Sequence, residues 1–117
     1  MRYDKTLGAL EEAQHRAVAT AKRRIETAEE SVAIYRSHMR RMQEDVYAIA
    51  SREGVAEDPG FRFEFQRISD EVEEEVRRAS QAISRLEEDL SAMAIRHSQE
   101  RERFLEEQHL TTGRSTN

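Results

Sequence analysis

The residues with the clearest capacity for chemistry are two Glu-x-x-His pairs, one near each end of the chain. Glu12 and His15 form the first pair, and Glu106 and His109 form the second. Residues three apart lie on one face of a helix, and such a pair from each of two helices contributes to the ligand set of di-iron carboxylate bundles. Those bundles need further carboxylates from two more helices. In the register predicted below, His15 lies opposite Gln99, about ten residues from His109, so we predict no metal site and no cofactor.

Carboxylates are concentrated in residues 70–75, with a smaller group at residues 87–89. Paired carboxylates act as general acid and base only where a pocket shifts their pKa values. A pair of long helices offers no such pocket, so these carboxylates are interpreted as a solvated face, paired in part with Arg36, Arg40 and Arg41. The sequence also has no Gly-rich phosphate loop and no nucleophile elbow. We therefore predict that the protein is not an enzyme and has no catalytic residues.

The composition is that of a polar helical protein. Of 117 residues, 37% are apolar and 37% are charged, and the net charge is −5. Acidic residues interrupt the basic clusters within a turn, which disfavours nucleic-acid binding. The chain has no Cys, no cleavable signal-peptide pattern and no apolar run of the roughly 20 residues that a membrane span needs. We expect a cytoplasmic location, and export by a route without a cleaved signal stays open.

A short break near the middle of the chain organises the expected fold. Gly54 is suited to end a helix, whereas Asp58 and Pro59 are suited to cap and begin the next one. A stop signal followed at once by a start signal predicts an all-α fold in which two long antiparallel helices form a coiled-coil helical hairpin. The expected hairpin covers residues 1–110, with helices at 3–53 and 59–109, a turn at 54–58, and a polar tail at 111–117 that frays.

Apolar residues at alternating steps of three and four predict the seam, meaning the line of side chains along which the two helices pack. In the first helix the predicted seam consists of Ala21, Ile25, Ala28, Val32, Tyr35, Met39, Met42, Val46 and Ile49. In the second helix it consists of Phe61, Phe65, Ile68, Val72, Val76, Ala79, Ile83, Leu86, Leu90 and Met93, with a slip in phase between Ile68 and Val76. Folding about Glu57 places Ala21 opposite Met93, and Arg40 and Arg41 opposite Glu74 and Glu73.

A single helical pair buries little apolar surface per residue to offset chain entropy, so we expect a further helical partner. Phe61, Phe63 and Phe65 begin the second helix, and Phe63 cannot share the face of the other two because residues two apart diverge on a helix. Phe63 is interpreted either as an exposed anchor for a partner or as a cover folded over Val55 or Ile49. The expected partner-binding residues are Phe61, Phe63, Phe65, Ile34 and Ile95, the last two lying off the seam.

The layout resembles the small α-helical targeting proteins encoded beside LXG-type toxins of the bacterial type VII secretion system. The matching stretches are residues 46–70 around the turn and the Glu/Arg-rich run 83–107, which contains Leu86-Glu87-Glu88-Asp89-Leu90. The resemblance implies a targeting factor that binds the N-terminal helical domain of a toxin, with or without a second small helical protein, and promotes its export.

Two motifs of these secretion proteins are missing. The chain has no Trp, so the Trp-x-Gly turn of the related hairpin substrates is absent. No Phe is followed four residues later by Asp, which places the chain with the class of partners that lacks the Phe-x-x-x-Asp motif. The alternative interpretations are a hairpin like the export chaperones of type III and flagellar secretion, and a homodimeric structural coiled coil.

Overall fold

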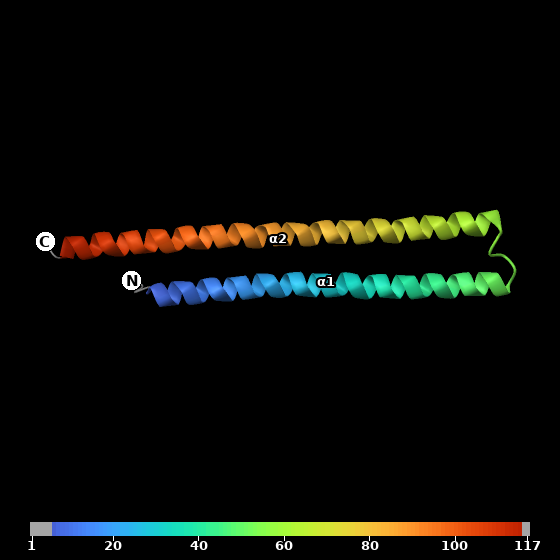
Figure 1. The fold of residues 1–117 in the computed structure, drawn as a ribbon, viewed down its shortest axis with the longest axis horizontal. Coiled ribbons are helices and arrows are strands. Elements are labelled where there is room, and N and C mark those ends of the chain that lie inside the picture. Colours follow the sequence, from blue (N-terminus) through green and yellow to red (C-terminus); the bar gives the residue numbers. More distant parts are fainter. Residues whose placement is uncertain (1–5, 116–117) are drawn as a thin grey trace, which may run out of the picture. The chain divides into compact units, whose positions relative to one another are not determined.

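The fold consists of two long α-helices. In the computed structural model, α1 spans Leu7–Arg52 and α2 spans Pro59–Ser115, and the short segment between them reverses the chain (Figure 1). The structure describes residues 6–115, with side chains described as far as residue 112, and that part of the chain contains no β-strand. Neither helix contains, within this range, an apolar stretch that could cross a bilayer. The all-α helical hairpin predicted from the sequence is confirmed.

The turn ends α1 through a glycine in the left-handed region. Gly54 has φ 75°, and its N–H donates to the carbonyl of Ser51 at 3.2 Å. The N–H of Val55 donates to the carbonyl of Ala50 at 2.9 Å. These two bonds form a Schellman motif, which satisfies carbonyls that the last helical turn leaves without partners.

Asp58 caps the start of α2. Its Oδ2 atom accepts a hydrogen bond from the N–H of Phe61 at 3.0 Å, and its carbonyl accepts one from the N–H of Arg62 at 2.9 Å. Pro59 occupies the first helical position, where a missing N–H removes no intrahelical bond. The predicted cap and start of the second helix are therefore present at the expected residues.

The other helix limits differ from the prediction. Thr6 caps α1 by accepting the N–H of Ala9 on its Oγ1 atom at 3.0 Å, so α1 begins at Leu7 rather than at residue 3. Residues 3–5 of the predicted helix lie outside the described residues. At the other end, α2 continues to Ser115 instead of fraying after residue 109, because each added residue gains one backbone bond once a helix exists and no proline interrupts this stretch.

The chain divides into two compact units. The turn unit comprises residues 26–84, and the terminal unit comprises residues 1–25 together with 85–117. Each unit combines a segment of α1 with a segment of α2 that runs in the opposite direction. The hydrogen bonds between the helices, described below, join residues whose numbers sum to between 111 and 115, close to the predicted 114.

The core is thin in both units. Ile25 and Ala50 are the buried apolar residues among those described, and they are 8% and 4% exposed. The other core positions are half-buried, and most match the predicted seam. In the turn unit they include Val32, Tyr35, Met39, Val72, Val76 and Ala79. In the terminal unit they include Ala21, Leu86, Leu90 and Met93. The helices thus bury a single seam, as expected for a two-helix layer.

Candidate protein-docking site

A polar pair redirects the seam in the turn unit. Gln43 is half-buried, and its Nε2 atom donates to the Ser69 hydroxyl at 3.2 Å. The Ser69 hydroxyl in turn donates to the carbonyl of Phe65 at 3.0 Å. The seam therefore passes through Gln43 and Ser69, one residue away from the predicted Met42 and Ile68. With Ser69 in place of Ile68, the two consecutive steps of four fall between Phe61 and Ser69, so the slip in phase lies nearer the turn than predicted.

This redirection leaves a row of aliphatic side chains in solvent. Met42, Val46, Ile49 and Ile68 were predicted to lie in the seam, and that prediction is wrong, because they are 56%, 45%, 50% and 47% exposed. Ala50 is buried in place of Ile49. Residues 42, 46 and 49 follow steps of four and three, so they share one face of α1. We call these four residues the apolar face.

A shallow groove runs beside the apolar face between α1 and α2. Its volume is about 120 Å³, and it is lined from α1 by Met39, Met42, Gln43 and Val46, and from α2 by Phe65, Ile68 and Val72. The groove therefore presents hydrocarbon from both helices. A second groove in the same unit includes Arg36, Arg40 and Glu73 in its lining, so its chemistry is charged. The contrast marks the first groove as the surface suited to another apolar face.

The aromatic residues after the turn divide into a packed pair and an exposed ring. The rings of Phe61 and Phe65 lie 5.6 Å apart, and Tyr47 approaches Phe65 edge-on at 6.0 Å. Phe61 and Phe65 are half-buried, so they serve mainly to close the turn end of the seam. Phe63 is 68% exposed, which contradicts the interpretation in which it folds over the loop.

The two remaining predicted partner-binding residues are also exposed, but the structure does not gather them with the phenylalanines. Ile34 belongs to the turn unit and does not line the apolar groove. Ile95 belongs to the terminal unit. Ile34 and Ile95 were selected because they lie off the predicted seam, and this criterion missed the apolar face, because all four of its residues lay on that seam. The sequence signal that could have revealed the apolar face is the position of Gln43 and Ser69, two polar residues that can pair across the helices.

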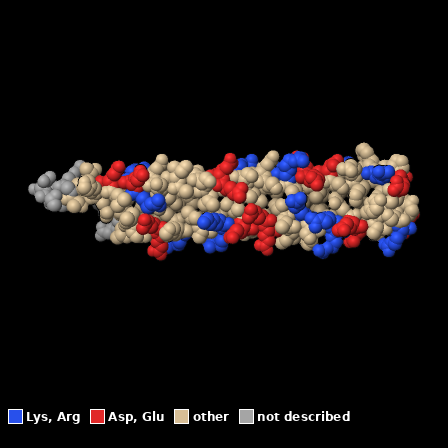
Figure 2. All heavy atoms as spheres, viewed as in Figure 1, with Lys and Arg blue, Asp and Glu red and all other residues tan. Residues whose placement is uncertain are grey.

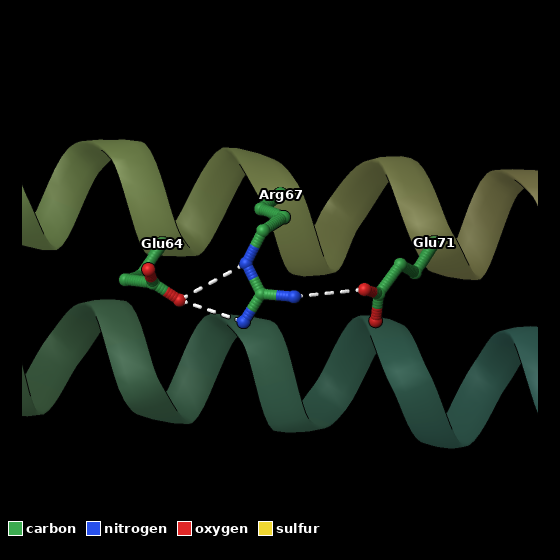
Figure 3. A network of polar contacts seen from close by, with 3 residues as sticks. All are labelled: Glu64, Arg67 and Glu71. Carbon is green, nitrogen blue, oxygen red and sulfur yellow. Dashed lines mark hydrogen bonds and ion pairs between the residues drawn. The ribbon is translucent and has the colours of Figure 1, made fainter.

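The ion pairs of the described residues form within α1, within α2 or at the turn, and none joins the two helices. Arg67 bonds to Glu64 at 2.7 Å and to Glu71 at 2.9 Å (Figure 3), and these contacts raise the pKa of its guanidinium. Glu74 pairs with Arg77 at 2.8 Å. The predicted pairing of the acidic block with arginines of the first helix is therefore wrong, since residues three or four apart on one helix are nearer partners. Figure 2 shows the two signs of charge interspersed over the face drawn.

One acidic residue of α2 does influence α1. Burial raises the pKa of the Tyr35 hydroxyl, and the charge of the Glu75 carboxylate and a hydrogen bond to it raise this pKa further. Both residues belong to the turn unit. Glu75 thus lies close enough to Tyr35 to act on it across the seam.

The terminal unit contains its own polar layer. Gln14 is 5% exposed, and its Nε2 atom donates to the carbonyl of His97 at 3.0 Å and to the Glu100 carboxylate at 3.1 Å. Arg101 donates to its Oε1 atom at 2.9 Å. The buried amide is therefore satisfied on both its nitrogen and its oxygen, and this layer fixes the register of the two helices within the unit.

The Glu-x-x-His pairs do not assemble into a metal centre in the part of the chain that the structure describes. Glu12 pairs with Arg16 at 3.1 Å, one turn away. Across residues 6–112, no group of three or more His, Cys, Asp or Glu side chains is arranged to hold a metal ion. His109 instead lies beside Leu105 and Leu110 in an open depression on α2.

Comparison of the chain with protein-family models, with curated proteins and with solved structures finds no match. The candidate site therefore rests on the physical character of the apolar face and its groove.

Proposed function

We propose that this protein is a non-enzymatic helical adaptor that binds a helical segment of another protein through the apolar face of its turn unit. The single observation that supports this function is the exposure of Met42, Val46, Ile49 and Ile68 on two adjacent helices. Scattered apolar residues on a surface are ordinary, but a contiguous set beside a hydrocarbon-lined groove is typical of an interaction site.

The size of the apolar face is consistent with an interaction hot spot. Burying a Val, Ile or Met side chain completely contributes about 1.5–3 kcal/mol. Since about half of the surface of each exposed side chain remains accessible to solvent, covering that half contributes roughly 1 kcal/mol per residue. Replacing one by a polar residue should therefore weaken binding by about tenfold or less, and replacing two should have a clearly larger effect.

The partner that we propose is the N-terminal helical domain of an LXG-type toxin, whose export through type VII secretion the adaptor would promote. The support for this choice is the resemblance in layout around residues 46–70 and along residues 83–107. A hairpin of the type III and flagellar export-chaperone kind, and a homodimeric structural coiled coil, are the competing functions. They differ from the proposal in the protein that covers the apolar face.

Co-expression tests the proposal directly. The chain is produced together with the N-terminal helical domain of a toxin encoded beside it, and the mixture is separated by gel filtration. We expect the two proteins to co-elute, and the double variant Val46→Gln/Ile68→Gln to lose most of the complex. The single variant Ile95→Gln is the matched control, because it makes the same kind of exchange at an exposed site in the other unit. A separate Phe63→Ala variant measures whether that ring also contributes.

Glutamine is chosen because it is a good helix former without charge, so the variants should keep their helix content in circular dichroism. Separate elution of wild-type chain and toxin domain at micromolar concentrations would contradict the toxin-specific proposal. Concentration-dependent dimerisation of the chain alone, abolished by the double variant, would favour the homodimeric coiled coil instead.

A further inference from the structure

The net charge of the protein is concentrated in the unit that carries the apolar face. Residues 26–84 contain 8 Lys and Arg against 14 Asp and Glu, a net charge of −6, whereas the other residues contain 11 against 10, a net charge of +1. The interaction surface is therefore set in a strongly acidic unit, although the charge of the chain as a whole is only −5.

Several of these carboxylates border the apolar face. Glu64 precedes Ile68 by four residues, Glu71 follows it by three and Glu75 follows it by seven. Residues at these spacings share one side of a helix. Arg67 binds Glu64 and Glu71 together (Figure 3), so the three-residue network keeps one negative charge.

The α1 side of the apolar face adds another acidic group. Asp45 stands three residues after Met42 and four before Ile49, so it shares their side of α1, and it forms no ion pair among the described residues. Arg41 is also close by on α1, four residues before Asp45. On α2, Arg78 lies 3.8 Å from Glu75, so the three carboxylates with Arg67 and Arg78 keep one net negative charge. The rim of the groove is therefore net acidic on α2 and mixed on α1.

This charge distribution distinguishes between the two helical occupants that could cover the face. A second copy would bring another unit of −6 against the first, and like charges at an interface oppose association and slow the encounter. A helix with basic flanks would gain from the same field, which both steers it to the groove and helps to fix its orientation.

We propose that the occupant of the apolar groove is a basic amphipathic helix of a different protein. Its aliphatic side chains, at steps of three and four, lie along Met42, Val46, Ile49 and Ile68, and Lys or Arg on one flank faces Glu64, Glu71 and Glu75. This inference rests on the proposed docking function and adds the charge of the partner to it.

Two synthetic helical peptides of about three heptads test the charge preference. Both carry the same Leu and Ile stripe, but one has Lys and the other Glu at the flanking positions. Each is labelled and held at nanomolar concentration, and its fluorescence anisotropy is measured as the full-length chain is added. We expect the Lys peptide to bind at least about tenfold more tightly than the Glu peptide in low salt. The difference should shrink in high salt, because the screening length falls from about 10 Å at 0.1 M to about 3 Å at 1 M.

Variants of the chain locate the interaction. Val46→Gln/Ile68→Gln should weaken both peptides, whereas the triple variant Glu64→Gln/Glu71→Gln/Glu75→Gln should remove most of the advantage of the Lys peptide. Ile95→Gln should change neither affinity.

The outcomes separate this inference from the proposed function. Equal affinity for the two peptides overturns the charge preference and leaves the docking function standing. The same holds if the Lys peptide does not bind while the toxin domain still co-elutes in a way that depends on Val46 and Ile68. Self-association through the same residues identifies a second copy as the occupant and overturns the inference. Failure of both peptides and of the toxin domain contradicts both proposals.

Discussion

Single polar residues determine which face of each helix is buried. Gln43 and Gln14 both occupy seam positions that an apolar residue would ordinarily fill, and each finds partners on the other helix. A buried polar group is tolerated only when its hydrogen bonds are made. Such residues thus specify the register of the pair, and at Gln43 the consequence is that Met42 stays in solvent.

Substitutions of Gln14 test the contribution of the polar layer in the terminal unit. Gln14→Ala should lower the free energy of unfolding by about 1–3 kcal/mol, because it removes three hydrogen bonds and leaves space in the seam. Gln14→Leu fills the same space with hydrocarbon and should retain most of the stability. Urea unfolding followed by circular dichroism measures both values, and an unchanged midpoint for Gln14→Ala would contradict the described contacts.

The pKa of Tyr35 tests the approach of Glu75 across the seam. Because burial and Glu75 both raise this pKa above its ordinary value of 10.0, Glu75→Gln should lower it toward that value without restoring it completely. Because the pKa of Tyr35 is higher in the folded than in the unfolded state, its protonated hydroxyl stabilises the fold below pH 10. This stabilisation is lost as the pH rises through the folded-state pKa of Tyr35. Titration of the Tyr35 ring carbon by NMR measures the shift, and an identical pKa in the variant would place Glu75 elsewhere.

At the scale of the elements, the turn was predictable because its residues have few alternatives. A glycine with positive φ, an aspartate cap and a proline at the first helical position each satisfy a separate backbone requirement, and all three are found where the sequence predicts them. The seam was less predictable. Met42 and Gln43 both fit a spacing of three or four, and a criterion based on apolarity alone selects Met42.

The same limit applies to the partner-binding residues. The apolar face could not be separated from the seam by sequence, because its residues satisfy the heptad spacing that defines a seam. Only the pairing of Gln43 with Ser69 shows that the heptad continues through neighbouring residues. Phe63 could be distinguished from the seam by sequence, because it lies two residues from both Phe61 and Phe65, which pack together.

The cap of α2 gives a test at the element scale. Asp58→Ala should lower the free energy of unfolding by about 0.5–2 kcal/mol, because the N–H of Phe61 loses its acceptor. Asp58→Asn keeps an oxygen acceptor and is the matched control, expected to lose much less. Thermal unfolding by circular dichroism distinguishes them, and equal melting temperatures for both variants and the wild type would show that the cap is not formed in solution.

At the scale of the whole molecule, each unit joins two helical segments through one narrow seam, and the two units differ in what they expose. The terminal unit has nearly balanced charge, whereas the turn unit combines a net charge of −6 with the apolar face. A protein in which few of the described residues are buried has little stability to spare. Covering the apolar face with the partner that we propose would therefore also stabilise the protein.

Methyl NMR of the labelled chain during titration with the Lys-flanked peptide tests this account most directly. The account predicts that the methyl signals of Met42, Val46, Ile49 and Ile68 shift together and saturate, while that of Ile95 stays in place. Saturable shifts confined to other residues, or no shifts at concentrations where the apolar face should be covered, would contradict it.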